Sequence, residues 1–155
     1  MSTTVADIMD RDPVTVQAGD GVDTVIRLLH DHHLPGLPVV DGEGRVVGIV
    51  TENDLLLYEE QEDVEPPPHV QIMGGVIFLG SVKHWEERVR KSLASTVRHL
   101  MTPDPVTIAP DASPKEAGGL IAEHHHNRLP VVDPDGRLLG VVTRVDVLEA
   151  LLAER

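Results

Sequence analysis

The chain contains no cysteine, and this absence excludes several functions at once. A disulfide framework, a thiolate zinc site and a cysteine nucleophile all need a residue that none of the 155 positions supplies. Phenylalanine, tryptophan and tyrosine occur once each. The hydrophobic core must therefore be built from valine, leucine and isoleucine, and recognition of nucleic-acid bases by aromatic stacking is nearly excluded.

Basic residues are also scarce. Thirteen Lys and Arg stand against 26 Asp and Glu, which gives a net charge of −13. Binding to nucleic acid or to anionic lipid needs a basic surface, so both kinds of partner are disfavoured. No apolar run approaches the ~18 residues of a membrane span, and the first residues do not resemble a secretory signal. The sequence therefore predicts a soluble, cytoplasmic protein.

An internal repeat organises the chain. Shifted by 92 residues, positions 5–57 align with 97–149 without a gap, and 21 of the 53 pairs are identical. A duplication of this kind indicates one supersecondary unit present twice, with two apolar sheet faces that cover each other. The repeated motifs are Asp-Pro-Val-Thr (12–15 and 104–107), Leu-Pro-Val-Val-Asp (37–41 and 129–133), Gly-Arg (44–45 and 136–137) and Val-Thr-x-x-Asp (50–54 and 142–146).

Each repeat predicts the element order β-α-β-β-α, so the expected fold is α+β with two repeats packed as a pseudo-two-fold pair. Ser113, Pro114 and Glu116 are the N-cap, first position and capping-box acid of a helix that runs to about residue 125. Its counterpart is expected over 21–33. Strands are expected at 14–16, 37–40, 46–50, 129–132 and 138–142, and terminal helices are expected to begin at Thr51 and Thr143.

The duplication predicts repeat 1 over 1–57, an insert over 58–96 and repeat 2 over 97–155. The insert opens with an acidic stretch at 59–63 and three prolines at 66–68, followed by an apolar segment at 72–79 that glycine interrupts. Trp85, Val89, Leu93 and Val97 then recur every four residues, which predicts a helix of about 84–101. This helix is expected to lie on the core. The alternative is an exposed apolar surface for a partner subunit.

Both repeats carry Val-Thr-x-x-Asp where a strand is followed by a helix. One interpretation is structural: the hydroxyl caps the third backbone N–H, and the carboxylate lies at the positive end of the helix. The other interpretation is functional. The hydroxyl and the helix N-terminus bind a phosphate, and the carboxylate accepts hydrogen bonds from the vicinal hydroxyls of a ribose. The spacing alone leaves both interpretations open.

The full set of duplicated motifs resembles a pair of CBS domains, also called a Bateman module, over residues 5–57 and 97–153. The resemblance implies a stand-alone regulatory module that binds an adenosine-containing ligand (AMP, ADP, ATP, S-adenosylmethionine or NAD(H)) between the two repeats, with no other cofactor required. It also implies clefts to which both repeats contribute. One repeat supplies the early strand and the residues before Leu-Pro-Val-Val, and the other supplies Thr-x-x-Asp.

This resemblance assigns two sets of ligand-binding residues. The favoured cleft would contain Val14, Val16, Leu34, Pro35, Thr143, Arg144 and Asp146. The second cleft would contain Val106, Ile108, His126, Asn127, Arg128, Thr51 and Asp54.

The preference between the clefts rests on charge. Arg144 follows one motif threonine and Glu52 follows the other, and a cation beside a phosphate is favourable whereas an anion is not. The first cleft is therefore expected to be the better phosphate site. Arg128 argues in the opposite direction, because it would bring a cation to the second cleft.

Nine histidines, six of them at 30, 32, 33 and 124–126, are the second unusual feature. They are expected to close the first helix of each repeat, where such side chains suit the negative helix end. A His-rich metal site is the alternative, although neighbouring positions on a helix diverge by ~100°. Gly118 and Gly119 lie inside the second of these helices. They indicate either a weak helix or the close approach of a neighbour to its backbone.

No nucleophile elbow, phosphate-binding loop or zinc-protease motif occurs, so no enzymatic activity is expected and no residue is assigned a catalytic role. The sequence favours a regulatory module that senses an adenine nucleotide, forms a homodimer by resemblance and acts on a protein that the sequence does not identify. The insert would be an added interface. The alternatives are a structural or dimerisation module without a ligand, and a His-rich metal-binding protein.

Overall fold

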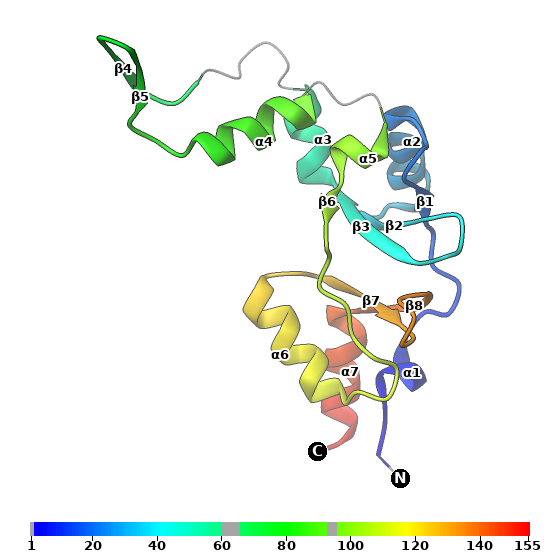
Figure 1. Ribbon diagram of the computed structural model, residues 1–155. Coiled ribbons are helices and arrows are strands. Elements are labelled where there is room, and N and C mark those ends of the chain that lie inside the picture. The colour runs from blue at the N-terminus through cyan, green and yellow to red at the C-terminus, as the bar shows by residue number, and fades with distance from the viewer. Residues whose placement is uncertain (1, 60–65, 93–95) are drawn as a thin grey trace. The chain divides into compact units, whose positions relative to one another are not determined.

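The computed structural model describes residues 2–59, 66–92 and 96–155 of an α+β chain (Figure 1). Strands β1, β2, β3 and β6 form one sheet in that order, while β4–β5 and β7–β8 are separate two-stranded sheets. The helices are α1 (Val5–Ile8), α2 (Val22–His32), α3 (Glu52–Glu59), α4 (Val82–Ser92), α5 (Val97–Leu100), α6 (Pro114–His124) and α7 (Arg144–Ala153). The strands are β1 (Val16–Gln17), β2 (Gly36–Val40), β3 (Val46–Thr51), β4 (His69–Ile72), β5 (Gly75–Phe78), β6 (Thr102–Pro103), β7 (Arg128–Val132) and β8 (Leu138–Thr143).

Most elements of the two repeats lie where the sequence predicts them. Helix α6 begins with the predicted capping box, in which Glu116 N donates to Ser113 Oγ at 3.1 Å and Ser113 N donates to Glu116 Oε2 at 3.1 Å. The predicted first strand of repeat 1, at 14–16, is displaced, because only Val16 and Gln17 pair with β2. In repeat 2 the corresponding segment forms a single bridge at Ile108.

The chain divides into two compact units that interleave the two sequence repeats. One unit contains residues 1–17, 38–49 and 102–155, and the other contains 18–37 and 50–101. The opening helical turn of each repeat therefore packs within the other repeat. Val5 N donates to Ala112 O at 2.8 Å, and 92 residues further along Val97 N donates to Asp20 O at 2.9 Å. The next residue repeats the match, because Ala6 N donates to Pro110 O and Arg98 N donates to Ala18 O, each at 2.9 Å.

The predicted continuous helix over 84–101 is wrong. Helix α4 covers the first part, but Thr96 has an extended backbone (φ −125°, ψ 159°) and caps the separate helix α5. The N–H groups of Val97 and Arg98 donate to the 18–20 segment, and the Val97 side chain is completely buried. Val97 therefore belongs to the opening turn of repeat 2 and does not share an apolar face with Trp85. Leu93 lies outside the described residues, as does the predicted acidic stretch from residue 60 on.

The apolar segment at 72–79 contributes to a β-hairpin that the sequence analysis did not identify. Strands β4 and β5 pair in antiparallel register, and Gly74 occupies the turn with a φ of +95°. Glycine adopts this left-handed conformation at no steric cost, which makes Gly74-Gly75 a turn signal in retrospect.

The core of the first unit is aliphatic, as the near absence of aromatic residues predicts. Val5 from repeat 1 is buried together with residues of repeat 2, which shows that the exchanged opening turn is part of the core. The buried cluster is Val5, Ile108, Ala117, Ile121, Leu129, Val131, Val142 and Val147. No helix of the described ranges is both long enough and apolar enough to cross a bilayer.

Candidate functional site

The first turn of α7 holds the Thr-x-x-Asp motif of repeat 2. Strand β8 leads directly into this helix, and Thr143 is the N-cap with an extended backbone. Its hydroxyl accepts from Asp146 N at 3.2 Å, while Thr143 N donates to Asp146 Oδ2 at 2.9 Å. The structural interpretation of the motif is therefore confirmed here. The capping bonds use one oxygen of a half-buried carboxylate, and the same group carries a second acceptor, Oδ1.

The corresponding turn of repeat 1 has the same motif in a different environment. Thr51 N donates to Asp54 Oδ2 at 2.9 Å, and the Thr51 hydroxyl donates to the same oxygen at 3.3 Å. Asp54 is only 3% exposed and is the buried charged residue of the described core. The carboxylate of repeat 1 is thus part of the packing, whereas Asp146 remains accessible.

Residues that precede Leu-Pro-Val-Val lie beside the Thr-x-x-Asp helix of their own repeat. Arg144 N donates to Asn127 O at 2.8 Å, and Glu52 N donates to Pro35 O at 3.0 Å. Arg144 is assigned to the favoured cleft and Asn127 to the second cleft, while Pro35 is assigned to the favoured cleft and Glu52 to neither. The grouping of each set with the threonine and aspartate of the other repeat stays a prediction.

The repeats differ at the residue directly before Leu-Pro-Val-Val, which begins strand β2 in repeat 1 and strand β7 in repeat 2. A Cβ atom on Gly36 would lie 3.0 Å from Val50 O and 3.3 Å from Thr51 Cγ2, so the backbone comes too close there for a side chain without movement. The equivalent position of repeat 2 is Arg128, whose residue is half-buried in β7. Repeat 2 therefore carries a cation at a position that in repeat 1 is restricted to glycine.

The remaining predicted residues divide between core and surface. Val16 and Ile108 are 2% and 6% exposed, so these two side chains contribute mainly to the core, while Val14 and Val106 are half-buried. Leu34 N donates to Leu29 O and His126 N donates to Ile121 O, which closes α2 and α6 in the same way.

The histidines before these residues take the helix-closing role that the sequence predicts. His33 and His125 are the C-caps of α2 and α6, with left-handed φ values of 53° and 55°. The rings of His124 and His126 stack with centroids 6.0 Å apart. Within 2–59, 66–92 and 96–155, no group of three or more His, Asp or Glu side chains is arranged to hold a metal ion.

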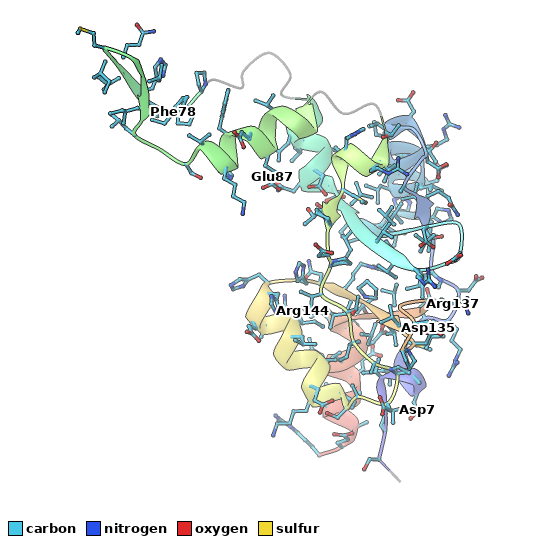
Figure 2. The ribbon with its side chains drawn as sticks, in the orientation of Figure 1. Asp7, Phe78, Glu87, Asp135, Arg137 and Arg144 are labelled. Carbon is cyan, nitrogen blue, oxygen red and sulfur yellow. The ribbon has the colours of Figure 1, made fainter. Side chains whose placement is uncertain are left out.

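A cavity of about 500 Å³ lies between α6 and α7, within the size range of ligand pockets. Its polar lining includes the cationic side chains of Lys115 and Arg144 and no carboxylate, in a chain with 26 acidic residues. Arg144 lies at the end of α6 where α7 begins (Figure 2). The lining residues are Lys115, Gly118, Ile121, Ala122, His125, His126, Asn127, Arg144, Val147, Leu148 and Leu151.

This cavity brings together Arg144, His126 and Asn127 from the two predicted sets, but Thr143 and Asp146 are not part of its lining. Sequence reasoning did not assign Lys115 to a site. Its helical spacing from Gly118 and Ala122 was the available signal, because positions 3–4 residues apart share one face. A Cβ atom on Gly118 would meet Val147 Cγ1 at 3.4 Å, so α7 is the neighbour that approaches this glycine.

A second cavity of about 440 Å³ contains none of the predicted ligand-binding residues. Asp104, which has a left-handed φ of 51°, is one of its lining residues. The other lining residues are Val46, Val47, Pro105, Thr107, Val132 and Gly136.

Comparison with known proteins identifies the family. The model described as "CBS domain" matches residues 5–60 and 97–153. The chain therefore belongs to the CBS domain family and carries two copies of the domain. This confirms the resemblance on which the site assignment rests, together with the α+β fold of two repeats.

Relatives and solved structures of the same kind span most of the chain. The uncharacterized protein MJ1426 of Methanocaldococcus jannaschii is 33% identical over 96% of this chain and 90% of its own length. The chloroplastic protein CBSX2 of Arabidopsis thaliana is 32% identical over 88% of this chain, which corresponds to 58% of that protein. The crystal structure of CBSX2 in complex with AMP matches with a TM-score of 0.79 and 30% identity over 98% of both chains. The CBS domain pair of MJ0100, in complex with 5-methylthioadenosine and S-adenosyl-L-methionine, shares the fold (TM-score 0.69, 22% identity, 96% and 99% covered).

Proposed function

We propose that this chain is a regulatory module that binds an adenosine-containing nucleotide. The single observation that supports this most strongly is the similarity to the AMP complex of CBSX2, which spans 98% of both chains at 30% identity. The ligand class comprises AMP, ADP, ATP, S-adenosylmethionine and NAD(H). The proposal includes no catalytic role and no other cofactor.

Asp146 is the residue we assign to the ribose. A carboxylate accepts hydrogen bonds from vicinal ribose hydroxyls, and the half-buried Asp146 offers Oδ1 beside the oxygen that caps α7. Thr143 and the first turn of α7 would face a phosphate, because the N-terminus of this ten-residue helix carries positive partial charge. The walls for the base in this cleft remain those assigned by resemblance, Val14 and Val16.

We propose that Arg144 makes the N-terminus of α7 a better phosphate site than the N-terminus of α3, where Glu52 occupies the equivalent position. The cavity that Arg144 lines supports this assignment, because its lining contains cations and no carboxylate. The side chain of Arg144 is exposed, so salt weakens its attraction to phosphate. Charge reversal in Arg144→Glu should therefore weaken binding of ATP more than binding of adenosine.

Ligand binding would regulate a partner by favouring one arrangement of the chain over another. A ligand shifts such an equilibrium only by the difference between its affinities for the two states. A homodimer and a cytoplasmic location are part of the proposal.

The test is a thermal-shift and calorimetric panel with AMP, ATP, S-adenosylmethionine and NADH. At a hundredfold excess over the dissociation constant, a true ligand stabilises the fold by ~2.7 kcal/mol. The matched control is adenine-free ribose 5-phosphate, which shares the phosphate and the sugar. Stabilisation by one adenosyl ligand and not by the control supports the proposal. No response to any of the four contradicts it.

A second function, a structural or dimerisation module without a ligand, is favoured by the hydrogen bonds that the two motif aspartates already make. Both motif aspartates already bind backbone N–H groups of their own chain, and Asp54 is buried. This alternative predicts that no ligand of the panel stabilises the fold. Adding zinc or nickel to the same scan tests the histidine alternative.

A further inference from the structure

The cavity between α6 and α7 has an apolar wall. The residues that form this wall are all aliphatic or glycine, and two of them, Ile121 and Val147, are buried in the core. Ligand pockets of this size are lined mainly by apolar side chains, together with a few polar groups that fix the orientation of the ligand. The wall consists of Gly118, Ile121, Ala122, Val147, Leu148 and Leu151.

The polar side chains of the lining gather where α6 ends and α7 begins, and we call this region the polar end. His125 is the C-cap of α6, His126 and Asn127 follow it, and Arg144 is the first residue of α7. Arg144 N donates to Asn127 O at 2.8 Å, and Figure 2 shows Arg144 beside the end of α6. All four side chains can donate hydrogen bonds, so the polar end suits a ligand group that accepts them.

The charge of the lining favours an anion. Lys115 is the second residue of α6, so it lies roughly 14 Å along the helix axis from the last residue, His124. Positive charge is therefore present at both ends of the cavity, and the described residues that line it include no carboxylate. A pocket lined by charge of one sign concentrates ligands of the opposite sign, even on a chain with a net charge of −13.

The same lining does not suit the adenosine ligand proposed above. A ribose is bound by a carboxylate that accepts hydrogen bonds from its hydroxyl groups, and neither Thr143 nor Asp146 lines this cavity. The apolar wall offers no hydrogen-bonding side chain to a base, whereas it can remove an alkyl chain from water. The cavity therefore fits a different class of ligand.

We propose that this cavity is a second ligand site, which binds an amphiphilic anion. An alkyl chain lies along the apolar wall, and a carboxylate or phosphate head group lies at the polar end. The ligand is a free molecule and not a bilayer lipid, because an anionic membrane surface repels this acidic chain. The site goes beyond the proposed nucleotide binding. Its tests use His125 and Gly118, which belong to neither predicted cleft, and the full chain without nucleotide, so their outcome does not depend on the nucleotide panel.

The primary test is calorimetric titration of the full chain with decanoate and with decyl phosphate, each below its micelle concentration. Decyltrimethylammonium provides the same alkyl chain with a positive head group, while acetate and inorganic phosphate provide the head group without the chain. One molecule of decanoate or decyl phosphate should bind per chain, and each control compound should bind about tenfold more weakly or less. Binding of one anion alone identifies the head group. Binding of neither anion, or equal binding of the ammonium compound, overturns the proposal.

His125→Glu tests the polar end, because it places a carboxylate beside the head group. The matched control is His33→Glu. His33 is the C-cap of α2 with a φ of 53°, against 55° for His125, and it does not line the cavity. The two substitutions therefore place glutamate in the same left-handed conformation. Decanoate should bind about tenfold more weakly to His125→Glu and within about twofold of wild type to His33→Glu. Equal affinities of the two variants overturn the proposal.

Gly118→Leu tests the apolar wall, because the added side chain occupies part of the cavity. The control is the adjacent Gly119→Leu, where a Cβ atom meets nothing within 4 Å and the residue does not line the cavity. Both variants replace a helical glycine with a better helix former, so their effects on α6 itself are alike. Decanoate affinity should fall about tenfold in Gly118→Leu and stay within about twofold of wild type in Gly119→Leu.

Ala122→Leu repeats this test at an exposed position of the wall, in case Gly118→Leu displaces Val147, whose Cγ1 lies 3.4 Å from the added Cβ. Circular dichroism shows which variants keep the wild-type fold. Unchanged decanoate affinity in a folded Gly118→Leu or Ala122→Leu variant overturns the proposal.

Discussion

The two Thr-x-x-Asp helix starts have the same sequence pattern but different surroundings. In repeat 1 the carboxylate of Asp54 is buried and receives both the N–H and the hydroxyl of Thr51. In repeat 2 the Thr143 hydroxyl accepts from Asp146 N, and Asp146 is half-buried. A duplicated motif thus serves packing in one copy and leaves an accessible acceptor in the other. This difference is why we assign the ribose to Asp146.

The largest effect on stability is expected where the opening segment of repeat 1 crosses β8 of repeat 2. A Cβ atom on Gly140 would lie 2.5 Å from Asp10 O and 2.7 Å from Met9 Sδ, so the backbone must move. Gly140→Ala should therefore destabilise the fold by about 3 kcal/mol. The control is Gly119→Ala, where open space around a helical glycine predicts a gain of about 0.5–1 kcal/mol. Urea unfolding measures both changes in the free energy of unfolding. If Gly140→Ala costs less than a typical surface substitution, the packing of the opening segment of repeat 1 against β8 is contradicted.

The buried and accessible aspartates should differ in their contribution to stability. Asp54→Ala leaves the Thr51 N–H and hydroxyl without their acceptor in a buried site, at a cost of about 2–3 kcal/mol. Asp146→Ala removes a cap from a more solvated turn and should cost about 1 kcal/mol. Denaturant unfolding of the two variants, compared at equal protein concentration, gives both values. Equal losses of unfolding free energy, or a larger loss for Asp146→Ala, would contradict the assignment of Asp54 to the packing and of Asp146 to an accessible position.

The turns that join β2 to β3 and β7 to β8 give a smaller, pH-dependent effect on stability. Backbone N–H groups of Arg45 and Glu43 donate to Asp41 and hold the pKa of its carboxyl below the ordinary value. A lowered pKa in the folded state means that the ionised form stabilises the fold above the unfolded pKa of about 4, and that this stabilisation is lost as the pH falls through the folded pKa.

Asp41→Asn should therefore lower the melting temperature at pH 7, and the difference from wild type should shrink below pH 4. The control is Asp135→Asn in the turn between β7 and β8. Asp135 donates its backbone N–H to the Asp133 carboxylate. Figure 2 shows Asp135 and its neighbour Arg137 in that turn. A difference that stays constant from pH 7 to pH 3 is inconsistent with the assigned pKa shift.

The sequence predicted the features that repeat and the features that depend on local chemistry. The offset of 92 residues, the Ser113–Glu116 capping box and the histidine C-caps are all local patterns, and the structure confirms them. The Thr143–Asp146 box is confirmed in the same way. Local hydrogen bonds follow residue type and spacing, so they can be read from one sequence.

Features that depend on distant segments could not be predicted in this way. The helix break at Thr96 arises because Val97 N–H binds Asp20 O, a contact between residues far apart in the chain. The burial of Asp54 depends likewise on what packs around it, and its motif is identical in type to that of Asp146. The hairpin at 69–78 is a local feature that was missed because Gly74-Gly75 was interpreted as an interruption of one apolar segment, and not as the turn between two strands.

The most direct measurement is the calorimetric dissociation constant of AMP for Asp146→Asn and Asp54→Asn, two substitutions that keep the side-chain shape and a capping oxygen. The account predicts a loss of roughly tenfold or more in affinity for Asp146→Asn, the equivalent of one hydrogen bond to a charged acceptor, and a change within about twofold for Asp54→Asn. An unchanged affinity in Asp146→Asn, or a greater loss in Asp54→Asn, would contradict it.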